Sequence, residues 1–420
     1  MRTHRSISIV AATLLTLALA SPATAAGGAT LEDVDILSTL TVDGGVALGW
    51  AVSELADIDG DGITDAIVSD HAYDNSAGAA FVFSGASGQL IHSLHGTGLL
   101  GYSIADAGDV DGDGTHDIIA GSPAANAATV FSGASGDPIL TLTSPRTEAV
   151  GVAVSTAGDV NADGHADLLV GAQFADVNGT DAGRVYVFSG ADGSVIRAYD
   201  GSAAGDLFGT ATASVGDIDG DGYVEHAIGA RDAGKWNDGG VWVHSGRTGA
   251  LLWSFRSPKQ GEELGSFFVA GLDDLTGDGV PDVYAGDYFA TTNGHHSGEA
   301  YVFSGADGSV WRSRSGDSAN DGLGPGREAG DLNGDGVQDL VVGSFSSNDG
   351  AADAGKFQVF SGADLSALGT VAGTTPGDEL GFDAVGIDDV NGDGTPDLLV
   401  SASPGAVAYI VSGASVIASD

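Results

Sequence analysis

The sequence contains no cysteine, so no disulfide can stabilise this chain in an oxidising compartment. Basic residues are also scarce: 14 Lys and Arg face 58 Asp and Glu, which gives a net charge of −44 at pH 7. This charge excludes nucleic acids and anionic membranes as expected partners. Long apolar segments with a helical period are nearly absent, which argues against a helical solenoid. The chain has instead 69 glycines and a repeated acidic motif.

The acidic motif is a nonapeptide that occurs seven times. Its copies begin at residues 57, 109, 159, 217, 274, 331 and 389, so they lie 50–58 residues apart. Positions 1, 3, 5 and 9 carry oxygen-containing side chains and position 6 is glycine, a pattern that suits a hard cation such as calcium. Position 12, which is a bidentate Glu in an EF-hand, is apolar in every copy, so the motifs are not EF-hands. Each motif leads directly into a strand-like apolar run, which predicts a loop between two strands.

The predicted cofactor is Ca²⁺, with up to seven ions, one in each loop. Each copy offers positions 1, 3, 5 and 9 through side chains and position 7 through its main-chain oxygen. The candidate ligands are Asp57, Asp59, Asp61, Ile63 and Asp65; Asp109, Asp111, Asp113, Thr115 and Asp117; Asp159, Asn161, Asp163, His165 and Asp167; Asp217, Asp219, Asp221, Tyr223 and Glu225; Asp274, Thr276, Asp278, Val280 and Asp282; Asp331, Asn333, Asp335, Val337 and Asp339; and Asp389, Asn391, Asp393, Thr395 and Asp397. The first two copies have four acidic ligands each, so we expect them to bind calcium most tightly.

The segments around each loop repeat the same order of short strands. A strand of small residues precedes the loop, an apolar strand follows it, and after a linker come an alternating strand, a turn and a last strand. Four strands in each of seven units predict an all-β fold, a seven-bladed β-propeller of four-stranded antiparallel blades with a calcium loop in each blade. We expect a single domain over residues 27–420. Because too few residues follow the last repeat to make its fourth strand, the segment at about 31–41 is predicted to close the last blade.

The repeats resemble FG-GAP repeats, the units of the β-propeller of integrin α subunits, over roughly residues 42–415. The first element of that repeat is found at Leu48-Gly49, Phe208-Gly209, Leu264-Gly265 and Leu380-Gly381, and the second is approached at Gly121-Ser122-Pro123 and Gly171-Ala172. The second element departs to Ser69-Asp70-His71 and Ser401-Ala402-Ser403 in the end repeats. The resemblance implies seven blades, with the acidic loops on the face opposite the ligand.

The first 26 residues have the pattern of a secretory signal peptide. Arg2 and Arg5 precede an apolar segment, and Ala23-Thr24-Ala25 forms a small-residue cleavage site. The apolar segment is too short for a membrane-spanning helix. We therefore expect a secreted, extracellular protein that does not insert into a membrane and is monomeric.

Two classes of function remain open from the sequence. An adhesion or ligand-binding scaffold similar to integrin α, and not an enzyme, is favoured, because no nucleophile motif of the G-x-S-x-G type occurs. The alternative is a carbohydrate-binding lectin or a calcium-dependent polysaccharide lyase. His295 and His296 beside Glu299 could hold a transition metal or lie in a solvated loop. His116, His165 and His226 are expected at the surface.

The ligand, an extracellular protein or a glycan, is expected at the linkers between the second and third strands. These linkers are long and varied in the third to sixth repeats. They carry aromatic residues, a type that is common at binding interfaces. The candidate ligand-binding residues are Phe174, Trp236, Tyr288 and Phe289. Packing of the same rings against the neighbouring blade is the alternative interpretation.

Overall fold

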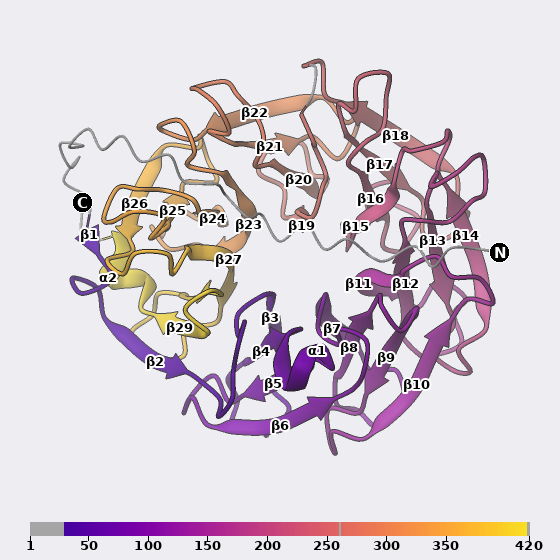
Figure 1. Cartoon of the computed structure of the whole chain (residues 1–420), viewed down its shortest axis with the longest axis horizontal. Coiled ribbons are helices and arrows are strands. Elements are labelled where there is room, and N and C mark those ends of the chain that lie inside the picture. Colours follow the sequence, from indigo (N-terminus) through magenta and orange to yellow (C-terminus); the bar gives the residue numbers. More distant parts are fainter. Residues whose placement is uncertain (1–28, 260–261, 418–420) are drawn as a thin grey trace.

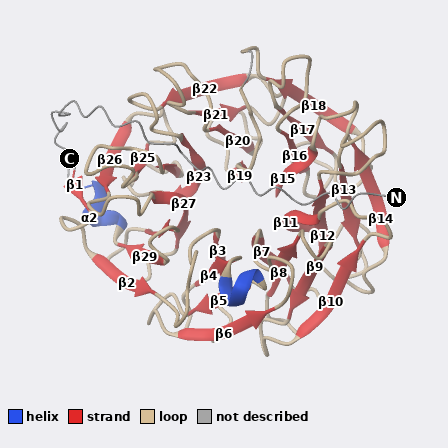
Figure 2. Cartoon of the chain, viewed as in Figure 1, coloured by secondary structure: helices blue, strands red, loops and turns tan. Residues whose placement is uncertain are grey.

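The strands are arranged as a ring of seven sheets around a central axis (Figure 1). The computed structural model describes residues 29–259 and 262–417, so the predicted signal peptide at 1–26 lies outside the described residues. Neighbouring strands within each four-stranded blade are antiparallel, as in β3–β4, β4–β5 and β5–β6. Strands and loops make up almost all of the described chain, with two short helices (Figure 2). The predicted seven-bladed β-propeller is confirmed.

The blades follow one another along the chain, and each runs from an inner strand at the axis to an outer strand at the periphery. Blade 1 contains β3 (Val52–Leu55), β4 (Asp65–Asp70), β5 (Ala79–Phe83) and β6 (Leu90–His95); blade 2 contains β7 (Ile104–Gly108), β8 (Asp117–Ser122), β9 (Ala127–Phe131) and β10 (Pro138–Thr143). Blade 3 contains β11 (Val150–Gly158), β12 (Asp167–Ala172), β13 (Arg184–Phe188) and β14 (Val195–Asp200); blade 4 contains β15 (Phe208–Ser214), β16 (His226–Ala230), β17 (Gly240–His244) and β18 (Leu251–Arg256).

The remaining blades keep this order but recruit strands from the start of the chain. Blade 5 contains β19 (Val269–Leu272), β20 (Asp282–Asp287), β21 (Glu299–Phe303) and β22 (Val310–Ser315); blade 6 contains β23 (Leu323–Gly330), β24 (Asp339–Ser344), β25 (Lys356–Phe360), β26 (Ala367–Ala372) and β1 (Ala29–Thr30); blade 7 contains β27 (Leu380–Ile387), β28 (Asp397–Ala402), β29 (Val407–Val411) and β2 (Ile36–Leu40). The helices are α1 (Tyr73–Ser76) and α2 (Gly413–Ile417).

Each strand has the composition that its radial position requires. The second strands, such as β12 with the sequence DLLVGA, are buried along their whole length because a neighbouring blade covers each face. They are therefore apolar throughout and do not alternate. The inner strands consist mostly of small residues, as in β15 with the sequence FGTATAS. Small side chains let seven strands approach the axis without filling it.

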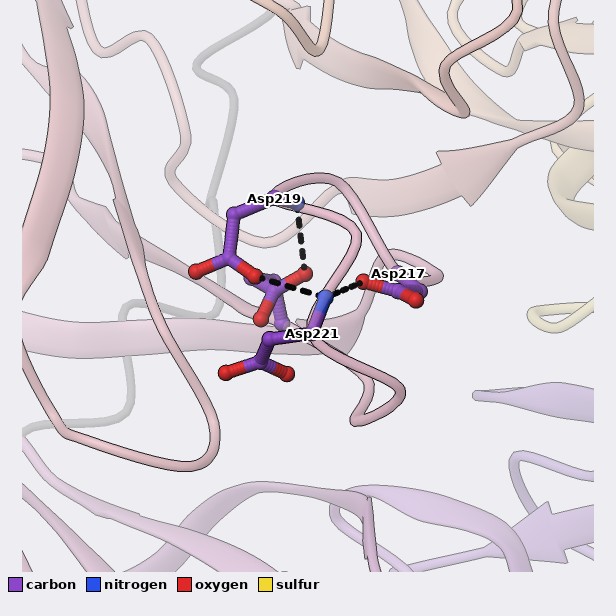
Figure 3. A group of neighbouring side chains, drawn as sticks. Asp217, Asp219 and Asp221 are labelled. Carbon is purple, nitrogen blue, oxygen red and sulfur yellow. Dashed lines mark hydrogen bonds between the residues drawn. The ribbon is translucent and has the colours of Figure 1, made fainter.

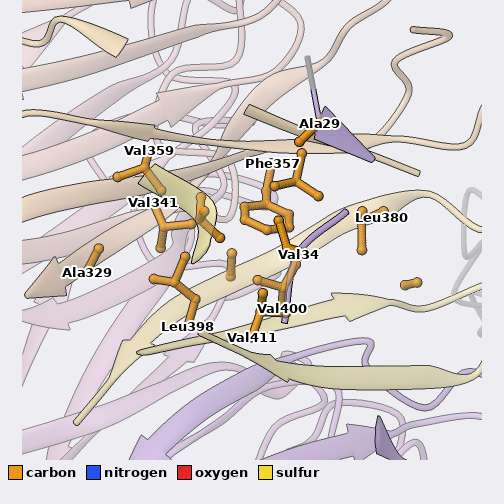
Figure 4. Packing of buried hydrophobic residues seen from close by; sticks show 14 of the residues in the cluster. Ala29, Val34, Ala329, Val341, Phe357, Val359, Leu380, Leu398, Val400 and Val411 are labelled. Carbon is orange, nitrogen blue, oxygen red and sulfur yellow. The ribbon is translucent and has the colours of Figure 1, made fainter. Parts of the chain in front are cut away.

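The core is divided among the junctions between neighbouring blades. Each of the seven buried clusters among the described residues draws on two successive blades. Between blades 6 and 7, Phe357 and Val341 of one blade pack with Leu398 and Val400 of the other (Figure 4). A single blade cannot bury both of its faces, so the fold is stable only as a ring.

The ring is closed by the start of the chain. Strand β2 pairs antiparallel with β29, with Leu40 opposite Ala408, and supplies the outer strand of blade 7. Just before it, β1 pairs in parallel with β26 of blade 6, which the sequence did not predict. The segment 29–40 therefore fastens the outer edges of two neighbouring blades. No helix of the described residues is both long and apolar enough to span a bilayer.

Candidate functional site

Each acidic motif forms the turn between the first and second strands of its blade. The first Asp of the motif orders this turn, as Asp217 shows in blade 4 (Figure 3). Its Oδ1 accepts N–H bonds from Gly220 at 2.8 Å and Asp221 at 3.0 Å, and its Oδ2 accepts one from Gly222 at 2.9 Å. Glycine at position 6 is required by backbone geometry, since Gly222 has φ +90° and an added Cβ would find open space.

Carboxylates gather most closely in the loops of blades 1, 2 and 4. Their ligand atoms lie within 4.8 Å of one another in three groups: Asp57, Asp59 and Asp61; Asp109, Asp111 and Asp117; and Asp217, Asp219, Asp221 and Glu225. The donors are all oxygen atoms, which fit a hard divalent cation such as Ca²⁺. Within the described part of the chain, no Lys or Arg forms an ion pair with these carboxylates. The negative charge of each group is therefore left for a cation to offset.

The loops with Asn or Thr at position 3 are built differently. Asn161 and Asn333 donate from Nδ2 to Oδ2 of the Asp at position 5, at 2.8 and 3.0 Å. The amide thus occupies a carboxylate oxygen that a cation would need. At position 7, the N–H of every copy donates to the position-5 Asp, as Val337 does to Asp335 at 2.9 Å. Loop 3 also has Ala162 at φ +58°, where the other copies have glycine.

The carboxylate at position 9 is buried and holds two turns of its blade together. In blade 2, Asp117 accepts the Val110 N–H at 2.8 Å on Oδ2 and the Gly133 N–H at 3.0 Å on Oδ1. The same pair of contacts recurs in the other blades through Asp65, Asp167, Glu225, Asp282, Asp339 and Asp397. The partner must be glycine, because a Cβ at Gly133 would lie 1.9 Å from the His116 carbonyl oxygen. We name this arrangement the carboxylate clamp.

Burial raises the pKa of the clamp carboxylates. The pKa of Asp117 rises to about 6, chiefly by desolvation, while the N–H bonds from Gly133 and Val110 oppose the shift. Desolvation raises the pKa of Glu225, the longer clamp residue of blade 4, to about 7. Sequence reasoning assigned position 9 to calcium alone and missed its bonds to the backbone. The signal was the Ser-Gly pair that ends the third strand of every repeat.

The histidines near the loops occupy different environments. His116 and His165 are partly exposed, and His165 Nδ1 lies 2.7 Å from the Val110 carbonyl oxygen of the preceding blade. The expectation that His226 lies at the surface is wrong. It is fully buried between the Tyr199 hydroxyl and the Ala157 carbonyl, and burial lowers its pKa to about 4. It follows the loop and belongs to a buried second strand, which accounts for the difference.

A cavity of about 1820 Å³ runs along the axis of the ring. Residues of all seven inner strands line it, and its two ends differ in chemistry. Glu54, Asp106 and Asp388 line the end beside the acidic loops. At the opposite end, where the inner strands begin, aromatic rings line the cavity. The two ends are separated by the length of an inner strand.

The rings at that opposite end form a continuous series over blades 5, 6, 7, 1 and 2, which we call the aromatic crescent. Its members are Tyr288, Phe289, Phe345, Phe382, Trp50, His71 and Tyr102, all of which line the cavity. Successive ring centroids lie 4.2–5.7 Å apart with planes tilted by 37–60°. Each ring is half-buried, so part of its surface remains free.

Polar residues complete the same end of the cavity on blades 3 and 4 and at the start of blade 5. We call Gln173, Arg231, Asp232 and Glu263 the polar sector. Arg231 Nε lies 3.9 Å from Asp232 Oδ1. Burial raises the pKa of Glu263, and the positive charge of Arg231 opposes that shift. Arg231 Nε and Gln173 Oε1 are buried atoms that form no hydrogen bond with the described residues.

The ligand-binding residues expected from the sequence are divided by the structure. Phe174, Tyr288 and Phe289 line the cavity, half-buried, whereas Trp236 does not line it and is 51 % exposed, with Lys235 Nζ 4.4 Å from its ring centroid. Sequence reasoning missed Trp50, Tyr102, Phe345 and Phe382 as cavity residues. Three of them belong to the Gly-aromatic pairs that mark the start of a repeat, and these pairs were the available signal.

The paired histidines of blade 5 do not gather with Glu299. The rings of His295 and His296 lie 3.7 Å apart. Glu299 Oε2 instead accepts bonds from Lys259 Nζ at 2.5 Å and Thr292 Oγ1 at 2.6 Å. No acidic or histidine group that includes His295 or His296 is found among the described residues. The histidine pair extends the aromatic crescent, since His296 contacts Phe289 at 4.7 Å.

Comparison with known proteins agrees with the architecture. The family model described as FG-GAP repeat matches residues 150–188 and 208–244, which are the first three strands of blades 3 and 4. Integrin alpha-5 of Xenopus laevis is 30% identical over 140 residues. That match covers 31% of this chain and only 13% of the integrin subunit. The chain is an FG-GAP repeat protein that folds as a seven-bladed β-propeller and is similar to part of an integrin α subunit.

Proposed function

We propose that the protein is a ligand-binding scaffold without catalytic activity, which is exported, monomeric and stabilised by calcium. The ligand binds at the end of the axial cavity that the aromatic crescent and the polar sector surround. An extracellular protein or glycan is the class of partner. The similarity to integrin α supports the scaffold role, and it rests on analogy of fold.

The observation that carries this proposal is the aromatic crescent. Half-buried rings from five blades meet at one end of a cavity, next to a small number of polar groups. Binding sites in proteins combine these two features: an apolar concave wall and a few placed polar side chains. Aromatic residues also supply much of the binding energy at protein interfaces.

Calcium has a structural role in this proposal. The three loops with close carboxylates, in blades 1, 2 and 4, would hold the ion through Asp side chains and the main-chain oxygen at position 7. The ion supplies positive charge to loops that would otherwise repel themselves. At tenfold excess over its dissociation constant, one site adds about 1.4 kcal/mol to the free energy of unfolding. In a chain without disulfides, calcium is the available external stabiliser.

Export is proposed from the first 26 residues, whose basic start, apolar segment and small-residue site fit a cleaved signal. Millimolar calcium outside the cell would saturate sites of the affinity typical of extracellular modules, about 0.1–1 mM. The export and calcium proposals therefore support each other.

The proposed function is tested by capture from a surface extract of the source organism. The immobilised protein is compared with Trp50→Ala and Phe382→Ala variants, and with Trp236→Ala as a matched exposed tryptophan outside the cavity. We expect a retained partner that both crescent variants lose and the Trp236→Ala variant keeps. Retention that is equal in all four proteins contradicts a site at the crescent.

A further inference from the structure

We propose that the crescent end of the cavity binds a neutral oligosaccharide chain, with the C–H faces of the sugar rings on the aromatic crescent and hydroxyls on the polar sector. This inference rests on the proposed function, because it assigns a ligand class to the same site. Three properties of the site lead to it: the arrangement of the rings, the unpaired polar atoms and the balance of charge.

The rings of the crescent present a curved wall of separate faces. Trp50 and Phe382 lie 5.2 Å apart with planes tilted by 41°, and Phe345 and Phe382 lie 5.6 Å apart at 60°. Rings at these angles do not cover one another, so each retains free surface. The face of an aromatic ring is negative, and it attracts C–H groups that neighbouring oxygens make partly positive. Sugar rings carry such C–H groups on their faces.

Buried polar atoms without partners lie beside these rings. Among the described residues, His71 Nδ1, Gln173 Oε1 and Arg231 Nε have no hydrogen-bond partner, and all three residues line the cavity. Arg231 Nε can only donate and Gln173 Oε1 can only accept. A buried group left unpaired costs about 1–3 kcal/mol, so a ligand that pairs with these atoms recovers that energy. A hydroxyl both donates and accepts, so a polyol satisfies the mixed set where a purely apolar ligand would not.

The charge at the site favours a neutral ligand over an ion. The protein has a net charge of −44, and Asp232, Glu263 and Glu379 line the cavity, so an anionic chain is repelled. A cation is already present: Arg231 lies 3.9 Å from Asp232, and its charge acts on Glu263, Tyr102 and Tyr288. An incoming cation would meet this guanidinium at the place where the carboxylates lie.

The size of the cavity indicates a chain of several units. Pockets for single small molecules have volumes of about 300–1,000 Å³. The axial cavity, at about 1820 Å³, exceeds this range. The crescent also extends over five blades, so it offers several rings in sequence to successive sugars. The expected ligand is therefore an oligosaccharide rather than a single monosaccharide.

The test uses the full chain in calcium buffer with defined probes. Native gels are cast with soluble neutral polysaccharides (laminarin, xylan, galactomannan, dextran), with anionic alginate as a comparison. The hexaose of any retarding polymer and a hexalysine peptide are then titrated by calorimetry. We expect retardation by at least one neutral polymer and none by alginate. Quenching or a shift of tryptophan fluorescence should accompany binding, and Trp50→Phe should change that signal.

Variants separate a sugar site from a general effect on folding. We expect Trp50→Ala and Gln173→Ala each to weaken hexaose binding by about tenfold or more, as for buried anchors in interfaces. Gln173→Ala removes an acceptor but no ring, so it tests the polar sector in a protein with an intact crescent. Trp236→Ala is the matched control and should bind as the unchanged protein does. Melting temperatures in calcium identify any variant that fails to fold.

The outcomes distinguish this inference from the proposed function. Failure of every neutral polymer to bind, or hexaose binding that Trp50→Ala and Gln173→Ala leave intact, overturns the sugar assignment. Tighter binding of hexalysine or of a captured protein, lost in Trp50→Ala, also overturns it but supports the crescent as a ligand site. Capture that is insensitive to every crescent variant contradicts the proposed function itself.

Discussion

The carboxylate clamp predicts that one acidic residue of a calcium loop stabilises the fold without calcium. Asp117 in blade 2 is the test case, because both of its main partners are buried. In the Asp117→Ala variant, the N–H groups of Val110 and Gly133 lose their acceptor. Each unpaired buried donor costs about 1–3 kcal/mol, which gives about 2–6 kcal/mol for the pair.

Removing the carboxylate also returns part of its desolvation cost. Burial raises the pKa of Asp117 from 3.8 to about 6. At about 1.36 kcal/mol for each pKa unit, this recovers on the order of 3 kcal/mol at neutral pH. The net loss in the free energy of unfolding is therefore about 1–3 kcal/mol. The Asp117→Asn variant keeps only one acceptor and turns an NH₂ group toward the other donor, so it should not restore stability.

Asp113 in the same loop is the matched control. It is exposed, and its Oδ1 accepts a single N–H bond from Thr115 at 2.8 Å. Urea denaturation followed by tryptophan fluorescence, with a chelator present, measures both variants. Asp113→Ala should change the free energy of unfolding by less than about 0.5 kcal/mol in chelator. Equal effects of Asp113→Ala and Asp117→Ala in chelator would refute the clamp as a source of stability.

Three further predictions concern calcium, pH and ring closure. Calcium should raise the melting temperature, and Asp61→Ala should remove more of this increase than Asn391→Ala, because Asp61 belongs to a close carboxylate group; an unchanged melting temperature after chelation contradicts this. Burial raises the pKa of Asp287 to about 7, so the folded state holds its proton more tightly than the unfolded state and stability falls as pH rises from about 4 through 7. Asp287→Asn should therefore gain on the order of 3 kcal/mol at pH 8 and little at pH 4, which urea midpoints at both pH values measure; parallel pH profiles would oppose the assignment. Leu40→Ala in the closing strand, at 0% exposure, should cost about 2–5 kcal/mol. Ile36→Ala, at 40% exposure in the same strand, should cost far less in the same urea experiment, and similar losses would speak against closure through β2.

The fold could be predicted from the sequence because each blade is specified locally and repeated. The acidic loop, the apolar second strand and the alternating third strand all fall within one repeat of 50–58 residues. The parallel pairing of β1 with β26 could not be predicted, because it involves only Ala29 and Thr30 beside Val371 and Ala372. Two residues carry no periodic signal, and their partners lie some 340 residues away.

The candidate site could be predicted only in part, for a related reason. Ligands of one loop are neighbours in the sequence, so their spacing is informative. The crescent instead gathers Trp50 with Phe382 and Phe345, which are about 300 residues apart in the chain. Exposure of single rings is equally hidden: Trp236 and Tyr288 occupy corresponding linkers, yet only Tyr288 faces the cavity. Which rings share a surface depends on how the blades are placed around the axis.

The crescent crosses the place where the ring closes, and this makes binding depend on closure. Phe382 belongs to blade 7 and Trp50 to blade 1, and their rings lie 5.2 Å apart. The same junction is held by the Val52 N–H, which donates to Asp383 Oδ2 at 3.0 Å, and by the hydrophobic cluster that includes Leu40 of β2. If blades 7 and 1 separate, the crescent is divided between Trp50 and Phe382. A variant that weakens closure, such as Leu40→Ala, should therefore reduce ligand affinity although Leu40 does not line the cavity, and calcium should restore binding only as far as it restores the closed ring.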